Sequence, residues 1–165
     1  MKNIIKFIAL IVFISSCTAP KEDNSTFDLG LSKFEKNKAI ADKTYDLFIA
    51  RDLDGMMDMH SEDLIWSPAS TNDTLSKAEF REGMAGWMSE FDAFTFINRQ
   101  YYPGVDENFI PDGSVRTYGT WIGTHKSGKQ TTTKYYSVLQ FNEDGKVTAD
   151  LEYFDLGGVF DQLED

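Results

Sequence analysis

The chain has 165 residues, of which 41% are hydrophobic and 14% aromatic. Its 27 acidic and 16 basic side chains give a formal net charge of −11 at pH 7, which argues against nucleic acid as a partner, because phosphate binding depends on basic patches. A single cysteine, Cys17, excludes a disulfide within the chain, so one domain has to be held together by its hydrophobic core.

The first sixteen residues have the pattern of an export signal. Lys2 and Lys6 precede an eight-residue apolar run, FIALIVFI. That run is shorter than the about 20 residues needed to span a bilayer. The following ISSC resembles the bacterial lipobox, and this resemblance implies that Cys17 becomes the lipid-modified first residue of the mature chain. We therefore expect a location in the cell envelope, on the periplasmic side or at the cell surface, with membrane contact only through the lipid.

Residues 17–31 are polar and include Pro20 and Gly30, which predicts a flexible tether after the lipidated cysteine. The sequence KED within it resembles the signal by which some lipoproteins of Bacteroidota reach the cell surface. The folded domain is expected to span residues 32–165.

Helices are predicted in the first half of this domain. The first begins at a capping box, Ser32 to Glu35, and runs to about Ala50. A short second helix leads into a strand at 63–68, and a second capping box, Ser76 to Glu79, opens a third helix. The side chains expected to face inward from this third helix are Phe80, Met84, Trp87, Met88 and Phe91.

Two glycines, Gly83 and Gly86, lie inside the third helix, where each costs about 1 kcal/mol relative to alanine. Either another element approaches the helix closely at these positions, or the glycines are simply tolerated.

After Phe91 the pattern changes to the period of two that is typical of strands. The predicted strands cover 91–102, 114–124, 129–141 and 146–155, and the segments between them are rich in turn-forming residues. Helices followed by such a meander predict an α+β fold, with N-terminal helices packed on one face of a curved, mainly antiparallel sheet.

The last strand raises a question about one carboxylate. In the stretch VTADLEYFDLGG, alternation places Val147, Ala149, Leu151, Tyr153 and Asp155 on one face, so Asp155 continues the apolar side. Such an acid has its pKa raised by burial and suits acid–base chemistry, or else it caps the adjacent LGG turn. Both interpretations remain open at this point.

Three stretches carry a family resemblance: LFIARDLDGMMDMHSEDLIWSP, FNEDGKV and EYFDLGGVFDQL. They resemble the SnoaL-like branch of the nuclear transport factor 2-like superfamily, over residues 33–163. The resemblance implies a cone-shaped fold with a pocket between the helices and the concave sheet. That superfamily includes polyketide cyclases, ketosteroid isomerase, scytalone dehydratase and binding modules without catalysis.

Carried over residue by residue, the resemblance disfavours a steroid isomerase. Where those enzymes have a base aspartate this chain has Ser67 and Pro68, and Lys134 stands in place of their hydrogen-bond-donating aspartate. In SnoaL-like cyclases an aspartate deep in the pocket moves the proton, and Asp155 matches it best. Lys134 either points inward, where it can pair with Asp155, or faces water.

Aromatic side chains are the candidates for the pocket wall. With Lys134, the predicted ligand-binding residues are Tyr45, Trp66, Trp121 and Tyr153, whereas Trp87 is expected in the core. Trp121 and Ile122 point to opposite faces, so one of them leaves the helix-covered side, which suits the sheet-to-sheet homodimers common among relatives.

The only histidines, His60 and His125, are isolated, so neither a metal site nor a cofactor is predicted. Two functions remain. The first is the binding of a small hydrophobic molecule without chemistry. The second is an acid–base enzyme of cyclase, isomerase or dehydratase type that uses Asp155 on an enolisable carbonyl. The lack of a recognisable second catalytic group favours the first.

Overall fold

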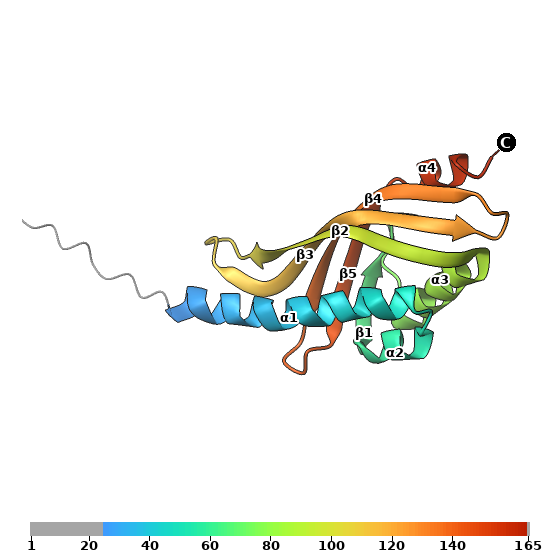
Figure 1. Ribbon diagram of the computed structural model, residues 1–165. Coiled ribbons are helices and arrows are strands. Elements are labelled where there is room, and N and C mark those ends of the chain that lie inside the picture. The colour runs from blue at the N-terminus through green and yellow to red at the C-terminus, as the bar shows by residue number, and fades with distance from the viewer. Residues whose placement is uncertain (1–24, 165) are drawn as a thin grey trace, which may run out of the picture.

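A computed structural model describes residues 25–164 of the chain, which fold around one sheet (Figure 1). Cys17, the predicted signal segment and the first part of the predicted tether lie outside the described residues. None of the described helices is long and apolar enough to cross a membrane.

The described elements follow the predicted order of helices first and strands second. In chain order they are α1 (Ser25–Ile49), α2 (Leu53–Asp58), β1 (His60–Ser67), α3 (Lys77–Glu90), β2 (Phe91–Val105), β3 (Pro111–His125), β4 (Gln130–Phe141), β5 (Val147–Phe154) and α4 (Leu156–Asp161).

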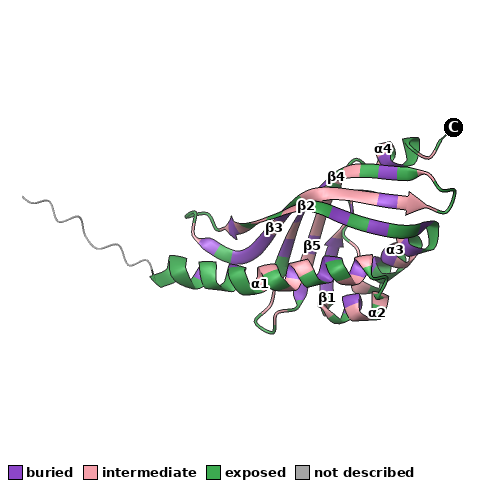
Figure 2. Ribbon diagram, viewed as in Figure 1, coloured by how far each residue is buried: buried purple, intermediate pink, exposed green. Residues whose placement is uncertain are grey.

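The sheet has five strands in the order β1-β5-β4-β3-β2. Strands β2 to β5 form an antiparallel meander, and β1 pairs in parallel with β5 at the edge. The curved sheet has α1, α2 and α3 on one side (Figure 1), and the buried core lies between them and the inner face of the sheet (Figure 2). The predicted α+β class, with helices on a curved and mainly antiparallel sheet, is confirmed.

Helix α1 starts earlier than the sequence indicates. Ser32 was expected to begin the helix, but it lies inside α1, which begins at Ser25, so that boundary is wrong. The reason is a contact far along the chain. Gly30 lies so close to β3 that an added Cβ would be 1.8 Å from the Pro111 carbonyl oxygen. Asn37 also donates to the Gly113 carbonyl at 2.8 Å. The packing of Gly30 on β3 extends the helix beyond its local start signal, and the Asn37 bond holds a later part of the helix on the same hairpin.

Helix α3 follows its local signals closely. Ser76 caps it, with both halves of the capping box present, and Phe80, Met84 and Met88 are buried as predicted. The two glycines have different explanations. A Cβ on Gly83 would lie 2.6 Å from the Trp66 ring, whereas a Cβ on Gly86 would meet nothing within 4 Å. Gly83 therefore makes room for Trp66, and Gly86 is tolerated.

A pocket with two acids on one strand

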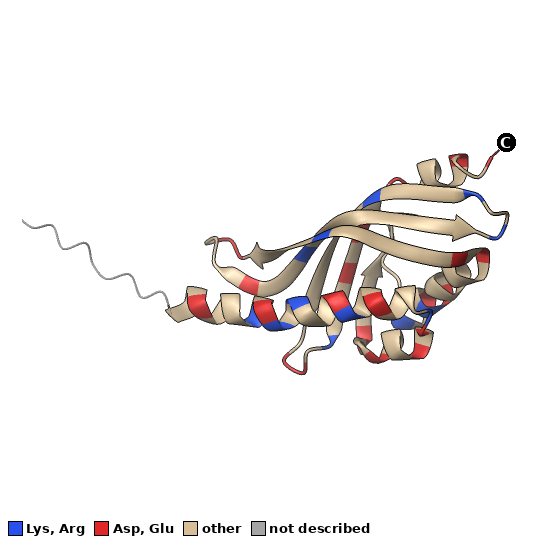
Figure 3. Cartoon of the chain, in the orientation of Figure 1, with Lys and Arg blue, Asp and Glu red and all other residues tan. Residues whose placement is uncertain are grey.

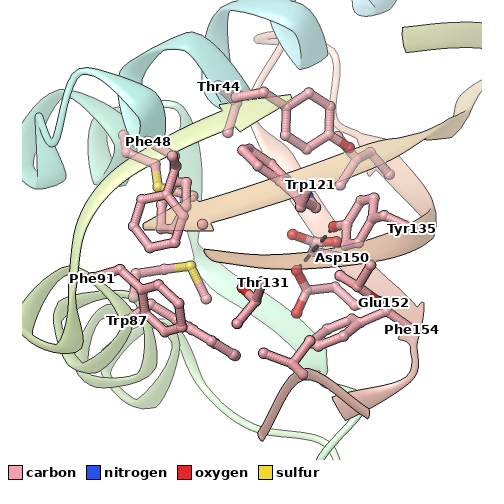
Figure 4. A pocket seen from close by; sticks show the side chains of 18 residues that line it. Thr44, Phe48, Trp87, Phe91, Trp121, Thr131, Tyr135, Asp150, Glu152 and Phe154 are labelled. Carbon is pink, nitrogen blue, oxygen red and sulfur yellow. Dashed lines mark hydrogen bonds between the residues drawn. The ribbon is translucent and has the colours of Figure 1, made fainter. Parts of the chain in front are cut away.

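A pocket lies between the inner face of the sheet and helices α1 and α3 (Figure 4). Its cavity has a volume of about 90 Å³ and opens to solvent at its mouth. Most of its wall is apolar or aromatic, and its rings are those of Tyr45, Phe48, Trp87, Phe91, Phe94, Trp121, Tyr135 and Phe154. A concave wall of apolar and aromatic side chains with a few polar groups has the character of a binding site for a small organic molecule.

Two carboxyl groups stand at one side of this wall, Asp150 and Glu152 of β5 (Figure 4). They are two residues apart, so both side chains leave the strand on the same face. Asp150 is only 5% exposed, and Glu152 is half-buried. Acids this deep in an apolar wall are unusual in a protein core and indicate a functional site.

Glu152 is held in place by two neutral donors. The Trp66 indole Nε1 donates to its Oε2 at 2.8 Å, and the Tyr135 hydroxyl donates to its Oε1 at 2.9 Å. Burial raises the pKa of Glu152, while these two hydrogen bonds lower it, and burial has the larger effect.

Asp150 has no such support, because its Oδ1 has no hydrogen-bond partner among the described residues. Burial, and then the nearby Glu152, raise the pKa of the Asp150 carboxyl well above its ordinary value. Two neighbouring carboxyls in a largely apolar site hold one negative charge between them more readily than two. Because only Glu152 has donors that stabilise a carboxylate, we assign the charge to Glu152 and the proton to Asp150.

Tyr45 closes the pocket from α1. Its hydroxyl oxygen lies 2.7 Å from Ser137 Oγ, and burial followed by the proximity of Asp150 raises its pKa, so it stays neutral. Its ring meets that of Trp121 edge to face at 6.1 Å, and Trp121 in turn stacks on Phe96 at 4.3 Å. Edge-to-face and stacked rings at these separations favour a rigid wall.

The expected inward position of Asp155 is wrong. Asp155 is exposed and caps α4, with its Oδ1 accepting from the Gly158 amide at 2.9 Å. The cause is a bulge in β5: Phe141 pairs with Val147, but Gln140 pairs with Ala149, so Thr148 is an extra residue. An extra residue reverses the alternation that follows it. The inward side after Thr148 is therefore the face that the sequence pattern indicated as outward.

Of the predicted ligand-binding residues, Tyr45 and Trp121 line the pocket. Trp66 does not line it but holds Glu152. The expected positions of Lys134 and Tyr153 in the pocket are wrong, because Lys134 is exposed and Tyr153 is 55% exposed and stacks on Tyr136 away from the helices. Both lie on strand positions whose side chains leave the sheet on the uncovered face.

The sequence pattern did not identify Asp150 and Glu152 as site residues, although both belong to the last predicted strand. Asp150 and Glu152 were placed on the outward face, where acids are ordinary, so they raised no question. Trp87 packs against the core, as expected, and it also lines the pocket. Within residues 25–164, no group of three or more His, Cys, Asp or Glu side chains is arranged to hold a metal ion.

The fold and pocket define a class of protein: a helix-covered, curved sheet around an apolar cavity. A family model for the SnoaL-like domain matches residues 41–149, and the chain belongs to that family. The family resemblance drawn from the sequence is confirmed for the domain. A comparison with curated protein sequences gave no significant match.

Solved structures agree on the fold. A candidate polyketide cyclase from Xanthomonas campestris has a TM-score of 0.67 at 12% identity, covering 80% of this chain and 99% of the other. AclR from Streptomyces galilaeus, described as a candidate hydroxylase, has a TM-score of 0.66 at 18% identity, and the match covers 79% of this chain and 85% of AclR. A candidate isomerase from Bacillus subtilis has a TM-score of 0.65 at 16% identity, and the match covers 79% of this chain and 94% of the isomerase. At these identities the similarity shows the fold alone.

Proposed function

We propose that the protein binds a small, largely apolar molecule in this pocket. The observation that carries the proposal is the unpartnered Oδ1 of Asp150, which is buried within a wall of aromatic and aliphatic side chains. A buried polar atom without a partner costs about 1–3 kcal/mol. A ligand that hydrogen-bonds to Asp150 removes that cost, and its apolar part gains contact with the rings of Tyr45 and Trp121.

Two matched substitutions test this proposal. Asp150→Asn changes the pocket, whereas Asp155→Asn makes the same chemical change at an exposed helix cap, where asparagine serves equally well. Native mass spectrometry of the full-length protein purified from its own host is expected to show a bound small molecule in the wild type and in Asp155→Asn. Asp150→Asn should retain about tenfold less of it. Equal retention in all three proteins, or an empty wild-type pocket, would contradict the proposal.

A second function, acid–base catalysis, is favoured by the inequality of the two acids. With the proton assigned to Asp150 and the charge to Glu152, an acid and a base stand side by side in a largely apolar site, as proton transfer at an enolisable carbonyl requires. The candidate acid is then Asp150 rather than Asp155.

This second function has a direct test in the exchange of α-hydrogens for deuterium in 2-indanone, followed by NMR in deuterated buffer. Catalysis predicts exchange faster than in buffer, slowed by about a hundredfold or more in Glu152→Gln. Exchange at the buffer rate with the wild type would rule out this chemistry on that ketone.

We also propose that Cys17 carries a lipid that holds the domain in the cell envelope. The support is the sequence pattern of residues 1–17. Metabolic labelling with a fatty acid should mark the wild type and not Cys17→Ser, and fractionation should release that variant from the membrane. A labelled Cys17→Ser protein would contradict the assignment.

A homodimer through the uncovered face of the sheet is a further part of the proposal. This face has an outer tyrosine row, Tyr102, Tyr118, Tyr136 and Tyr153, whose neighbouring rings lie 4.8–5.8 Å apart. The outward positions beside the row on β3 and β4 include Arg116 and Lys134 and no carboxylate. Acidic residues are instead spread along helices α1, α2 and α3 (Figure 3). Two copies of a chain with charge −11 repel each other least through this face.

Size-exclusion chromatography with light scattering tests the dimer. Tyr118→Asp places a carboxylate in the middle of the row and should give monomers. Phe109→Asp makes a similar change at an 80% exposed ring outside the row and should leave the dimer intact. A monomeric wild type would contradict this part of the proposal.

A further inference from the structure

The residues of charged type that line the pocket are all acidic. Two acids, Asp150 and Glu152, line it, and none of its described lining residues is a lysine, arginine or histidine. Two basic side chains of the sheet, Arg99 and Lys134, lie outside the pocket lining. Arg99 pairs with Asp42 at 2.7 Å and Asp46 at 2.8 Å, and Lys134 is on the opposite face of the sheet.

Within the described part of the chain, the negative charge of the Asp150–Glu152 pair is therefore stabilised only by neutral hydrogen-bond donors. Trp66 and Tyr135 each donate one hydrogen bond, and both bonds go to Glu152. A buried charge is stabilised far better by an opposite charge with hydrogen bonds than by neutral donors. The pocket therefore lacks two things: a positive charge, and a donor for Asp150 Oδ1.

Aromatic rings surround the same space. Tyr45, Trp121 and Tyr135 meet one another edge to face with centroids 6.1–6.2 Å apart, and Tyr135 lies 6.1 Å from Phe154. The faces of such rings attract cations, by about 2 kcal/mol or more where water is excluded. They also provide the apolar contact that an organic skeleton needs.

We propose that the ligand of this pocket is a protonated amine on a compact apolar skeleton. Its N–H groups donate to Asp150 Oδ1, its charge is balanced by the Asp150–Glu152 pair, and its skeleton lies against Tyr45 and Trp121. The inference rests on the proposed binding function and names the chemical class of the ligand.

This assignment has a consequence for pH. The titratable groups that face Asp150 are Glu152 on its own strand, Tyr45 from α1 and Tyr135 from β4; β1 contributes the non-titrating Trp66. Burial raises the pKa of both tyrosines, so they stay neutral, and Asp150 is the group that loses a proton when a cation binds. Amine binding therefore releases a proton and strengthens as the pH rises, whereas a carbonyl ligand needs the protonated acid and weakens.

Three probes with one skeleton and different charge test the inference: 2-aminoindane, 2-indanone and indane-2-carboxylate. Their binding to the full-length protein is measured by calorimetry at pH 6, 7 and 8, in buffers of different ionisation enthalpy. The amine is expected to bind about tenfold or more tighter than the ketone and to release protons. The carboxylate should bind weakest, because it meets two acids without a cation.

Variants separate the pocket from other binding sites. In Asp150→Asn the preference for the amine over the ketone should fall to about twofold or less, and Glu152→Gln should act in the same direction. Asp155→Asn should keep the full preference. An amine affinity unchanged in Asp150→Asn and in Glu152→Gln would overturn the inference, because the amine would then bind elsewhere.

Failure of the inference is distinguishable from failure of the proposed function. If the ketone binds the wild type as tightly as the amine, and Asp150→Asn weakens it, the pocket binds small molecules but not as an amine site. If none of the three probes binds and no molecule co-purifies, the proposed function fails as well.

Discussion

The two faces of the sheet both carry aromatic rows, but they use them differently. On the inner face, Phe96 stacks on Trp121 at 4.3 Å and is 6% exposed. On the outer face, Tyr118 stacks on Tyr136 at 4.8 Å and is 42% exposed. Ring contacts of similar geometry thus belong to a core in one place and to a surface in the other. Burial, and not the ring contact itself, determines how much each contributes to stability.

The positions of the charged side chains on the two faces do not favour stability, because the acids are on the buried side of the sheet. The inner face holds Asp150 and Glu152 in an apolar wall, whereas the outer strand positions of β3 and β4 hold the half-buried Arg116 and the exposed Lys134. Two acids in a core reduce stability unless a ligand compensates for them. Since the inner face contains the unfavourable groups, it is the face to which we assign the proposed function.

The largest expected effect compares one ring from each face. Phe96→Ala removes a fully packed ring and should lower the free energy of unfolding by about 3–5 kcal/mol. Tyr118→Ala should lower it by about 1 kcal/mol or less, because its ring is largely exposed. Urea unfolding measures both values. Similar losses would break the comparison, and a Tyr118→Ala cost that grows with protein concentration would show that a second copy covers the outer face.

A second effect concerns pH. His60 is 2% exposed, its Nδ1 lies 2.8 Å from the Met56 carbonyl oxygen, and burial lowers its pKa from 6.5 to about 4. The unfolded chain therefore binds more protons between these values, so stability falls as the pH falls from about 6.5 to 4, by about 3 kcal/mol in total. The raised pKa of Asp150 acts in the opposite direction, because there the folded state holds the proton.

The variant His60→Asn isolates this contribution, because its amide nitrogen can replace Nδ1. Denaturant unfolding at several pH values should show the difference between wild type and variant changing across pH 4–6.5. A difference that is constant with pH would contradict the prediction.

A smaller effect compares two glycines of α3. Gly86→Ala should stabilise the protein by about 1 kcal/mol through helix propensity alone. Gly83→Ala makes the same gain but forces its Cβ against the Trp66 ring, so we expect a net loss of about 1–2 kcal/mol. Thermal unfolding distinguishes the two. Equal stabilisation by both would show that Trp66 moves freely and does not hold Glu152 rigidly.

The smallest effect is at the helix cap that the sequence pattern suggested as a catalytic acid. Asp155→Ala should cost about 1 kcal/mol through loss of the cap on α4, and Asp155→Asn should cost almost nothing. Neither variant should change ligand affinity in calorimetry. A loss of ligand binding in Asp155→Asn would contradict the placement of Asp155 outside the binding site.

The features that sequence predicts well are those that depend on neighbours along the chain. Ser76 and Glu79 satisfy each other's backbone groups within one turn, so the start of α3 was readable. The period-two runs after Phe91 became the strands of the meander. By contrast, the capping pattern at Ser32 is equally clear as a local signal but is overridden by the packing of Gly30 on β3.

By itself, the sequence determined the α+β class, the order of the elements, the SnoaL-like resemblance and the aromatic character of the pocket, because each depends on composition or short-range periodicity. The tertiary structure alone decided where the acids point. A single extra residue at Thr148, visible only when β4 and β5 pair, turned Asp150 and Glu152 inward and left Asp155 outside. Strand pairing joins residues distant in the chain, so the register that creates the site cannot be read from either strand alone.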